Sequence, residues 1–148
     1  MNTITLEATV ENIARVTAFV EEQLEALNCP LRAQMQINVA VDEIFGNIAH
    51  YAYAPGTGEA TVRVALEEGG EAVEITFIDR GVPYDPLQKA DPDVTLSAEE
   101  RSVGGLGIFL VKKTMDGMSY AYEDGQNILR IRKLLRPAGS GGKEGKPK

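Results

Sequence analysis

The sequence lacks tryptophan and holds one cysteine and one histidine among its 148 residues. A lone cysteine, Cys29, excludes an internal disulfide, and with His50 as the only histidine it also excludes a zinc site built from cysteine and histidine. A Ser-His-Asp hydrolase would have to use His50, but the G-x-S-x-G turn that presents the nucleophile is absent. The composition therefore argues against zinc-thiolate and serine-hydrolase chemistry.

Long apolar runs and excess positive charge are also missing. No apolar run approaches the roughly 18 to 20 residues that a membrane-spanning helix needs. The N-terminus, MNTITLEATV, has neither a basic start nor an apolar stretch of signal-peptide length. These absences predict a cytoplasmic protein without membrane contact. The formal net charge of -7 predicts a surface that repels nucleic acid phosphates, so no direct nucleic acid partner is expected.

What is present is ordinary for a globular protein, with 43% hydrophobic and 25% charged residues. The chain length suits one domain. We assign that domain to residues 1–136. The last segment, PAGSGGKEGKPK at 137–148, has almost nothing apolar to bury, and a disordered tail is expected there.

Hydrophobic periodicity predicts the order of the elements. Alternating apolar and polar residues predict strands at 4–10, 59–68, 71–80, 118–124 and 127–135. Apolar residues at helical spacing predict helices at about 13–27, 31–51 and 106–115. Together they predict an α/β two-layer sandwich, in which a mixed, mostly antiparallel sheet of four or five strands is covered on one face by three helices.

The second predicted helix carries an unusual polar pair in the stretch DEIFGNIAH. Residues four apart lie on one face of a helix, so Glu43 and Asn47 point the same way and line the edge of the core if Ile44 and Ile48 face it. The pair fits a polar helix edge joined by a hydrogen bond. It equally fits one half of a functional site.

A second polar stretch, DRGVPYDP, follows an apolar strand. Asp79 ends that strand, and Gly81 lets the chain turn sharply, so a carboxylate is left at the strand end with backbone packed closely around it. This geometry can accept a hydrogen bond from an adenine amino group. An ordinary strand-terminal turn would have the same sequence.

The third stretch, GGLGIFLV, places Gly104, Gly105 and Gly107 at the start of an apolar helix. Glycines bring backbone N–H groups close to an anion, and a helix N-terminus adds positive partial charge, so phosphates could be held without a basic side chain. The segment is neither a Walker motif nor a Rossmann fingerprint. A glycine cluster that only ends a flexible loop is the alternative.

The order of these stretches resembles a known superfamily. Glu-x-x-x-Asn, then Asp-x-Gly, then Gly-x-Gly before a helix is similar to the N, G1 and G2 boxes of the GHKL ATPases, which include gyrase and the histidine kinases. The resemblance covers roughly residues 4–135. Within this superfamily, HYAYAPG, DRGVPYDP and GGLGIFLVKKTMD look most like the anti-sigma regulatory factors that have serine/threonine kinase activity.

The resemblance implies ATP and Mg²⁺ as cofactors and a role for each stretch. Asn47 would coordinate Mg²⁺, a hard cation that prefers oxygen ligands, and Glu43 would accept the proton from an attacking hydroxyl or water. Asp79 with Gly81 would hold the adenine, and the glycines at 104–107 would hold the phosphates. ATP would then lie between the second helix, the Asp79 turn and a lid at about 87–103.

The function implied by the resemblance is an ATP-dependent serine/threonine protein kinase that acts as an anti-sigma regulatory factor. Its partners would be a sigma factor and a small anti-sigma antagonist protein, which it phosphorylates, and a homodimer stays open. Two alternatives remain: a catalytically silent ATP-binding regulatory module, and an ATPase domain related to sensor histidine kinases. The sequence departs from the superfamily at residues 125–127, which read Gly-Gln-Asn where a third glycine box commonly ends in Gly-Thr.

Overall fold

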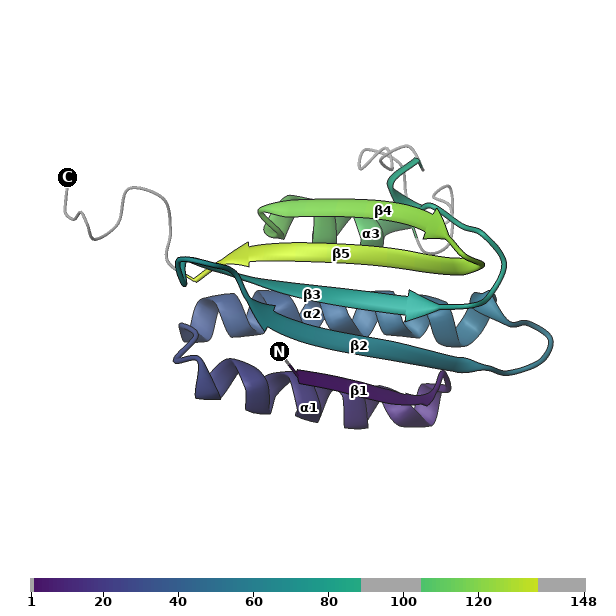
Figure 1. Ribbon diagram of the computed structural model, residues 1–148, viewed down its shortest axis with the longest axis horizontal. Coiled ribbons are helices and arrows are strands. Elements are labelled where there is room, and N and C mark those ends of the chain that lie inside the picture. The colour runs from purple at the N-terminus through teal and green to yellow at the C-terminus, as the bar shows by residue number, and fades with distance from the viewer. Residues whose placement is uncertain (1, 89–104, 136–148) are drawn as a thin grey trace.

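A computed structural model of the protein describes residues 2–88 and 105–135. These residues form a five-stranded sheet in the order β1-β2-β3-β5-β4, and three helices cover one face of it (Figure 1). All four strand pairings are antiparallel. The predicted two-layer α/β sandwich with helices on one face is confirmed.

The elements follow the predicted order along the chain. The strands are β1 (Asn2–Glu7), β2 (Glu59–Leu66), β3 (Ala72–Asp79), β4 (Gly117–Glu123) and β5 (Gln126–Leu134). The α-helices are α1 (Ile13–Ala26), α2 (Leu31–Asn47) and α3 (Gly105–Thr114). Three short helical segments complete the description: η1 (Val10–Asn12), η2 (Ile48–Ala52) and η3 (Pro86–Gln88).

Helix α2 is the central element of the helical layer and lies between α1 and α3 (Figure 1). Its inner face is fully apolar and buries Ala33, Ile37, Ala40, Val41, Ile44 and Phe45. These side chains pack into one core with those of the sheet, including Ile75 and Phe77 of β3. Burial of each large apolar side chain stabilises the fold by about 1.5–3 kcal/mol, so this helix is held firmly against the sheet.

The predicted second helix differs from the structure in its last turn. The α-helix ends at Asn47, and residues Ile48–Ala52 continue as a π-helical turn, η2. Single π-helical turns are rare in proteins, and those that occur are frequently found at functional sites. This turn leads the chain past the end of β3, where Asp79 lies.

Some predictions fall outside the described residues. These are Gly104, nearly all of the proposed lid at 87–103, and the tail at 137–148. Within the described residues, no helix is long and apolar enough to cross a membrane.

Candidate functional site

A cavity of about 470 Å³ opens between α2, η2 and the ends of β3 and β5. Its lining is mostly apolar with a few polar side chains, which is typical of sites for small ligands. The lining residues are Ile44, Asn47, Ile48, Tyr51, Ala52, Phe77, Asp79, Val82, Pro83, Tyr84, Pro86, Ile108, Tyr120, Asn127 and Leu129. Two predicted site residues, Asn47 and Asp79, therefore line the same cavity.

Asp79 is the last residue of β3 and is only 7% exposed. Its Oδ1 atom accepts hydrogen bonds from the Gly81 N–H at 2.8 Å and from Asn127 Nδ2 at 2.9 Å. No recorded hydrogen bond from the described part of the chain reaches Oδ2 of this cavity-lining residue. The structure thus fixes one carboxylate oxygen, while the other has no hydrogen-bond partner among the described residues.

Gly81 allows the turn after β3 to touch the end of η2. A Cβ atom at Gly81 would lie 2.2 Å from the Ala52 carbonyl oxygen, which no side chain can do. The same carbonyl accepts a hydrogen bond from the Val82 N–H at 3.0 Å. Gly81, which was predicted from the turn, is therefore required because the two backbones lie in close contact. This contact holds the turn after β3 against the end of η2, and both segments line the cavity.

Asn127, on β5, lies opposite Asp79 and was not assigned a role from the sequence. Its Nδ2 atom donates to Asp79 and to the Val82 carbonyl at 2.9 Å, and its Oδ1 accepts from the Tyr84 N–H at 3.1 Å and from the Tyr120 hydroxyl. A carbonyl can only accept and a backbone N–H can only donate, so these partners fix the orientation of the amide. Asn127 thereby ties the Asp79 carboxylate to the turn that follows it.

Tyr120 remains a donor in this network over the ordinary pH range. Burial raises the pKa of its hydroxyl above the usual value, so it stays protonated. A neutral hydroxyl is the state that donates to Asn127 Oδ1.

We predict that Asn127→Asp destabilises the protein. The substitution replaces the Nδ2 donor with an acceptor that faces the Asp79 carboxylate and the Val82 carbonyl. Buried polar atoms without a partner cost about 1–3 kcal/mol each, so the free energy of unfolding should fall by at least that amount near neutral pH. The loss should shrink in acid, because the protonated carboxyl can donate again.

Chemical denaturation of Asn127→Asp and the wild type across a pH series measures this effect. Equal stability of Asn127→Asp and the wild type near neutral pH would show that the network contributes nothing.

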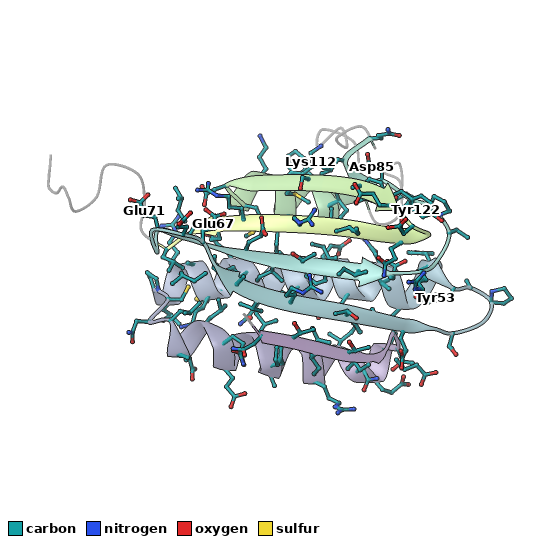
Figure 2. The ribbon with its side chains drawn as sticks, in the orientation of Figure 1. Tyr53, Glu67, Glu71, Asp85, Lys112 and Tyr122 are labelled. Atoms are coloured by element: carbon teal, nitrogen blue, oxygen red, sulfur yellow. The ribbon has the colours of Figure 1, made fainter. Side chains whose placement is uncertain are left out.

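Tyr53 is a second residue that supports the site and to which the sequence assigned no role. Its hydroxyl donates to the Glu59 carbonyl at 2.5 Å and accepts from the Arg80 N–H at 2.7 Å. A Cβ atom at Gly58 would lie 2.4 Å from the Tyr53 ring, so the ring packs directly on that glycine. Figure 2 shows Tyr53 at the end of the molecule where β3 finishes. The tyrosine holds the segment after η2 against the strand that ends in Asp79.

Glu43 and Asn47 meet as their spacing predicts. Both are half-buried on the last turns of α2, and Asn47 Nδ2 donates to Glu43 Oε2 at 3.1 Å. Asn47 lines the cavity, whereas Glu43 lies just outside its lining. The neighbouring Asp42 is exposed, and His50 is exposed with Nδ1 at 2.9 Å from the Gly46 carbonyl oxygen.

The glycine stretch lies next to this pair. Helix α3 begins at Gly105, and Gly107 in its first turn lies directly against the Glu43 carboxylate. Ile108, one residue further, lines the cavity together with Asn47. The structure thus brings Asn47 and the start of α3 to one part of the cavity wall, with Glu43 in contact with both, while Asp79 lies at the strand ends.

The donor set fits an adenine nucleotide better than a metal bound by protein alone. No group of three or more His, Cys, Asp or Glu side chains that could hold a metal occurs within 2–88 and 105–135. Mg²⁺ bound with a nucleotide needs few protein ligands, because phosphate oxygens and waters complete its shell. Within the described residues, neither the amide oxygen of Asn47 nor Oδ2 of Asp79 accepts a hydrogen bond, and both atoms are compatible with such a ligand.

Comparison with known proteins shows the family of the chain. Residues 6–133 match the family described as the histidine kinase-like ATPase domain. The serine/threonine-protein kinase BtrW of Bordetella bronchiseptica is 30% identical over 100 residues, which are 68% of this chain and 70% of BtrW. The serine-protein kinase RsbW of Listeria monocytogenes is 31% identical over 98 residues, which are 63% of this chain and 61% of RsbW.

Solved structures share the fold at low sequence identity. A Mycobacterium tuberculosis protein with RsbU and RsbW domains aligns with a TM-score of 0.62 and 19% identity, over 93% of this chain and 34% of that one. A chain of the SiaB–SiaC complex from Pseudomonas aeruginosa aligns with a TM-score of 0.52 and 18% identity, over 88% and 89%. The chain therefore belongs to the histidine kinase-like ATPase domain family and has protein kinases among its relatives.

Proposed function

We propose that this protein is an ATP-dependent, magnesium-requiring serine/threonine protein kinase that acts as an anti-sigma regulatory factor. The observation that carries the proposal is the convergence of the three sequence stretches on one cavity, with Asp79 at the strand ends and Asn47 beside the start of α3. The serine and serine/threonine kinases among its relatives support the same activity.

Nucleotide binding would divide between the two parts of the cavity. Oδ2 of Asp79 would accept a hydrogen bond from the adenine amino group, beside the Gly81 turn. The backbone N–H groups of Gly105 and Gly107, at the start of α3, would hold the phosphates. Gly104, which was also predicted to bind them, lies outside the described residues. Mg²⁺, when bound, would neutralise the triphosphate charge.

Asn47 is suited to be the protein ligand of that cation. Its Nδ2 atom is already committed to Glu43, so Oδ1 is the atom left to coordinate a metal. Amide oxygens are among the ligands that hard divalent cations accept.

Glu43 would act as the general base. The serine or threonine oxygen of the substrate attacks the γ-phosphorus as the bond to the ADP oxygen breaks, and the hydroxyl proton passes to the Glu43 carboxylate. Phosphoryl transfer depends mainly on positioning and charge stabilisation, so such a base must be held in place rather than only be present.

The proposed protein partners are a small anti-sigma antagonist, as the phosphorylated substrate, and a sigma factor. The outer face of α2 supports binding to a protein, because Leu31, Met35 and Val39 are 72%, 60% and 54% exposed on successive turns. A homodimer stays a prediction.

A catalytically silent nucleotide-binding regulator is the second candidate. The hydrogen bond between Asn47 and Glu43 is compatible with this candidate, because a purely structural pair would form the same contact. Such a protein would bind ATP and a partner but transfer no phosphate.

Incubation with labelled ATP, Mg²⁺ and candidate antagonist proteins encoded nearby tests the proposal. The expected result is phosphoserine or phosphothreonine on one antagonist, lost when the metal is chelated. Absence of transfer across all candidates, with ATP binding retained, would favour the silent regulator.

We also predict that Mg-ATP raises the melting temperature. A ligand selective for the native state adds about 2.7 kcal/mol of stability at 100 times its dissociation constant. Thermal unfolding with Mg-ATP, Mg-ADP and metal-free ATP measures the effect. Unchanged melting with both magnesium nucleotides at millimolar concentration would contradict the nucleotide site.

A further inference from the structure

We propose that Gly107 is a positioning residue for Glu43, because its missing side chain leaves the space that the Glu43 carboxylate occupies. The inference rests on the proposed role of Glu43 for its catalytic consequence. The contact between the two residues does not depend on that role.

The contact is defined by three atoms of one side chain. A Cβ atom at Gly107 would lie 2.1 Å from Glu43 Cδ, 2.1 Å from Oε1 and 2.5 Å from Oε2. Cβ contacts under 3.0 Å are essentially never found, so no other residue fits at 107 while Glu43 keeps this conformation. The three nearest atoms all belong to Glu43 and none to the backbone.

Gly107 differs in this respect from Gly81 and Gly125. Gly81 is limited by the Ala52 backbone, and Gly125 by a φ of 75° in the left-handed region. Gly107 lies within α3, where its backbone would accept alanine. The Glu43 carboxylate, and not backbone strain, is therefore what excludes a larger residue at position 107.

The packing restricts where the carboxylate can go. On one side Asn47 Nδ2 donates to Glu43 Oε2, and on the other side the Gly107 backbone closes the space. A methyl group at 107 would force the carboxylate out of its position between Gly107 and Asn47. Displacement of a catalytic group by about 1 Å can cost on the order of 100-fold in rate, with little effect on substrate affinity.

A role limited to phosphate binding predicts a different outcome. Alanine retains the backbone N–H group. If Gly107 only offered this donor, the effect of Gly107→Ala would be the same whichever residue stands at position 43. Dependence on residue 43 is thus the property that separates the two explanations.

The test is a double-mutant cycle on Gly107→Ala and Glu43→Ala, measured by equilibrium unfolding and by ATP titration. In the wild-type background, Gly107→Ala should raise the unfolding equilibrium constant by about five-fold relative to Gly46→Ala, because the Glu43 carboxylate must move and lose its hydrogen bond to Asn47. In the Glu43→Ala background it should be no more costly than Gly46→Ala, because the clashing carboxylate is gone and both changes gain the helix propensity of alanine over glycine. Gly46→Ala is the control, since a Cβ there would have its nearest contact at 3.8 Å.

Equal losses from Gly107→Ala in both backgrounds would overturn the inference. If Gly107→Ala alone cannot be purified, recovery of folded protein in the double variant supports it, and failure of the double variant overturns it. These readouts need no kinase activity, so they stand apart from the proposed function. Where a substrate is known, Gly107→Ala should lower kcat on the order of 100-fold with KM for ATP within a few-fold, and Glu43→Asp/Gly107→Ala should recover part of kcat.

Discussion

Replacing Glu43 with alanine is expected to lower phosphoryl transfer by roughly 10² to 10⁴-fold while ATP affinity stays within a few-fold. The base acts only as the hydroxyl attacks, so its loss removes an interaction made in the transition state and not in the ground-state complex. Calorimetry measures binding, and labelled phosphate on a confirmed antagonist measures transfer, on the same preparation.

Asn47→Ala should lose both properties, because the amide oxygen would hold the cation that bridges the phosphates. Asp42→Ala is the control, since Asp42 is exposed on the same helix. A wild-type rate of transfer by Glu43→Ala would contradict the assignment of the base. Two similar small losses of stability, with no change in nucleotide behaviour, would show that the pair is only structural.

Asp79→Asn is expected to weaken ATP binding by roughly 100-fold in a protein that still folds. This corresponds to about 2.7 kcal/mol, within the range of about 1–3 kcal/mol for a mismatched buried polar group. Oδ1 accepts from Gly81 and Asn127, and Oδ2 would accept from adenine. An amide has only one acceptor atom, so its NH₂ group must face a donor on one side or the other.

Calorimetric titration checks this expectation, with Asp85→Asn as a matched control. Asp85 is also an aspartate of the turn after β3, but its Oδ1 accepts a local hydrogen bond from the Leu87 N–H at 2.9 Å. Unchanged ATP affinity in folded Asp79→Asn would show that adenine is recognised elsewhere.

Local sequence patterns were sufficient for the elements and for part of the site. Alternation and turn residues located all five strands, and the two predicted hairpins form at Gly69-Gly70 and Asp124-Gly125, where φ is positive at all four residues. Glu43 and Asn47 could be paired because helical geometry places residues four apart together. Asp79 could be located because a strand end is visible as the end of an apolar alternation.

The rest of the site depends on contacts between distant segments. Asn127 reaches Asp79 only because β3 pairs with β5 in one particular register, and the sequence between the two, which lie 48 positions apart, carries no signal for it. Tyr53 meets Arg80 through the π-helical turn, which helical periodicity does not distinguish from an α-helix. The contact of Gly107 with Glu43 likewise requires the packing of α3 against α2.

Titration of ATP into the wild-type protein by calorimetry, with and without Mg²⁺, tests the central claim most directly. The account predicts saturable binding at one site per chain that depends on Mg²⁺ and is strongly weakened by Asp79→Asn. Absence of binding heat and of saturation at millimolar Mg-ATP, in a protein shown to be folded, would contradict it.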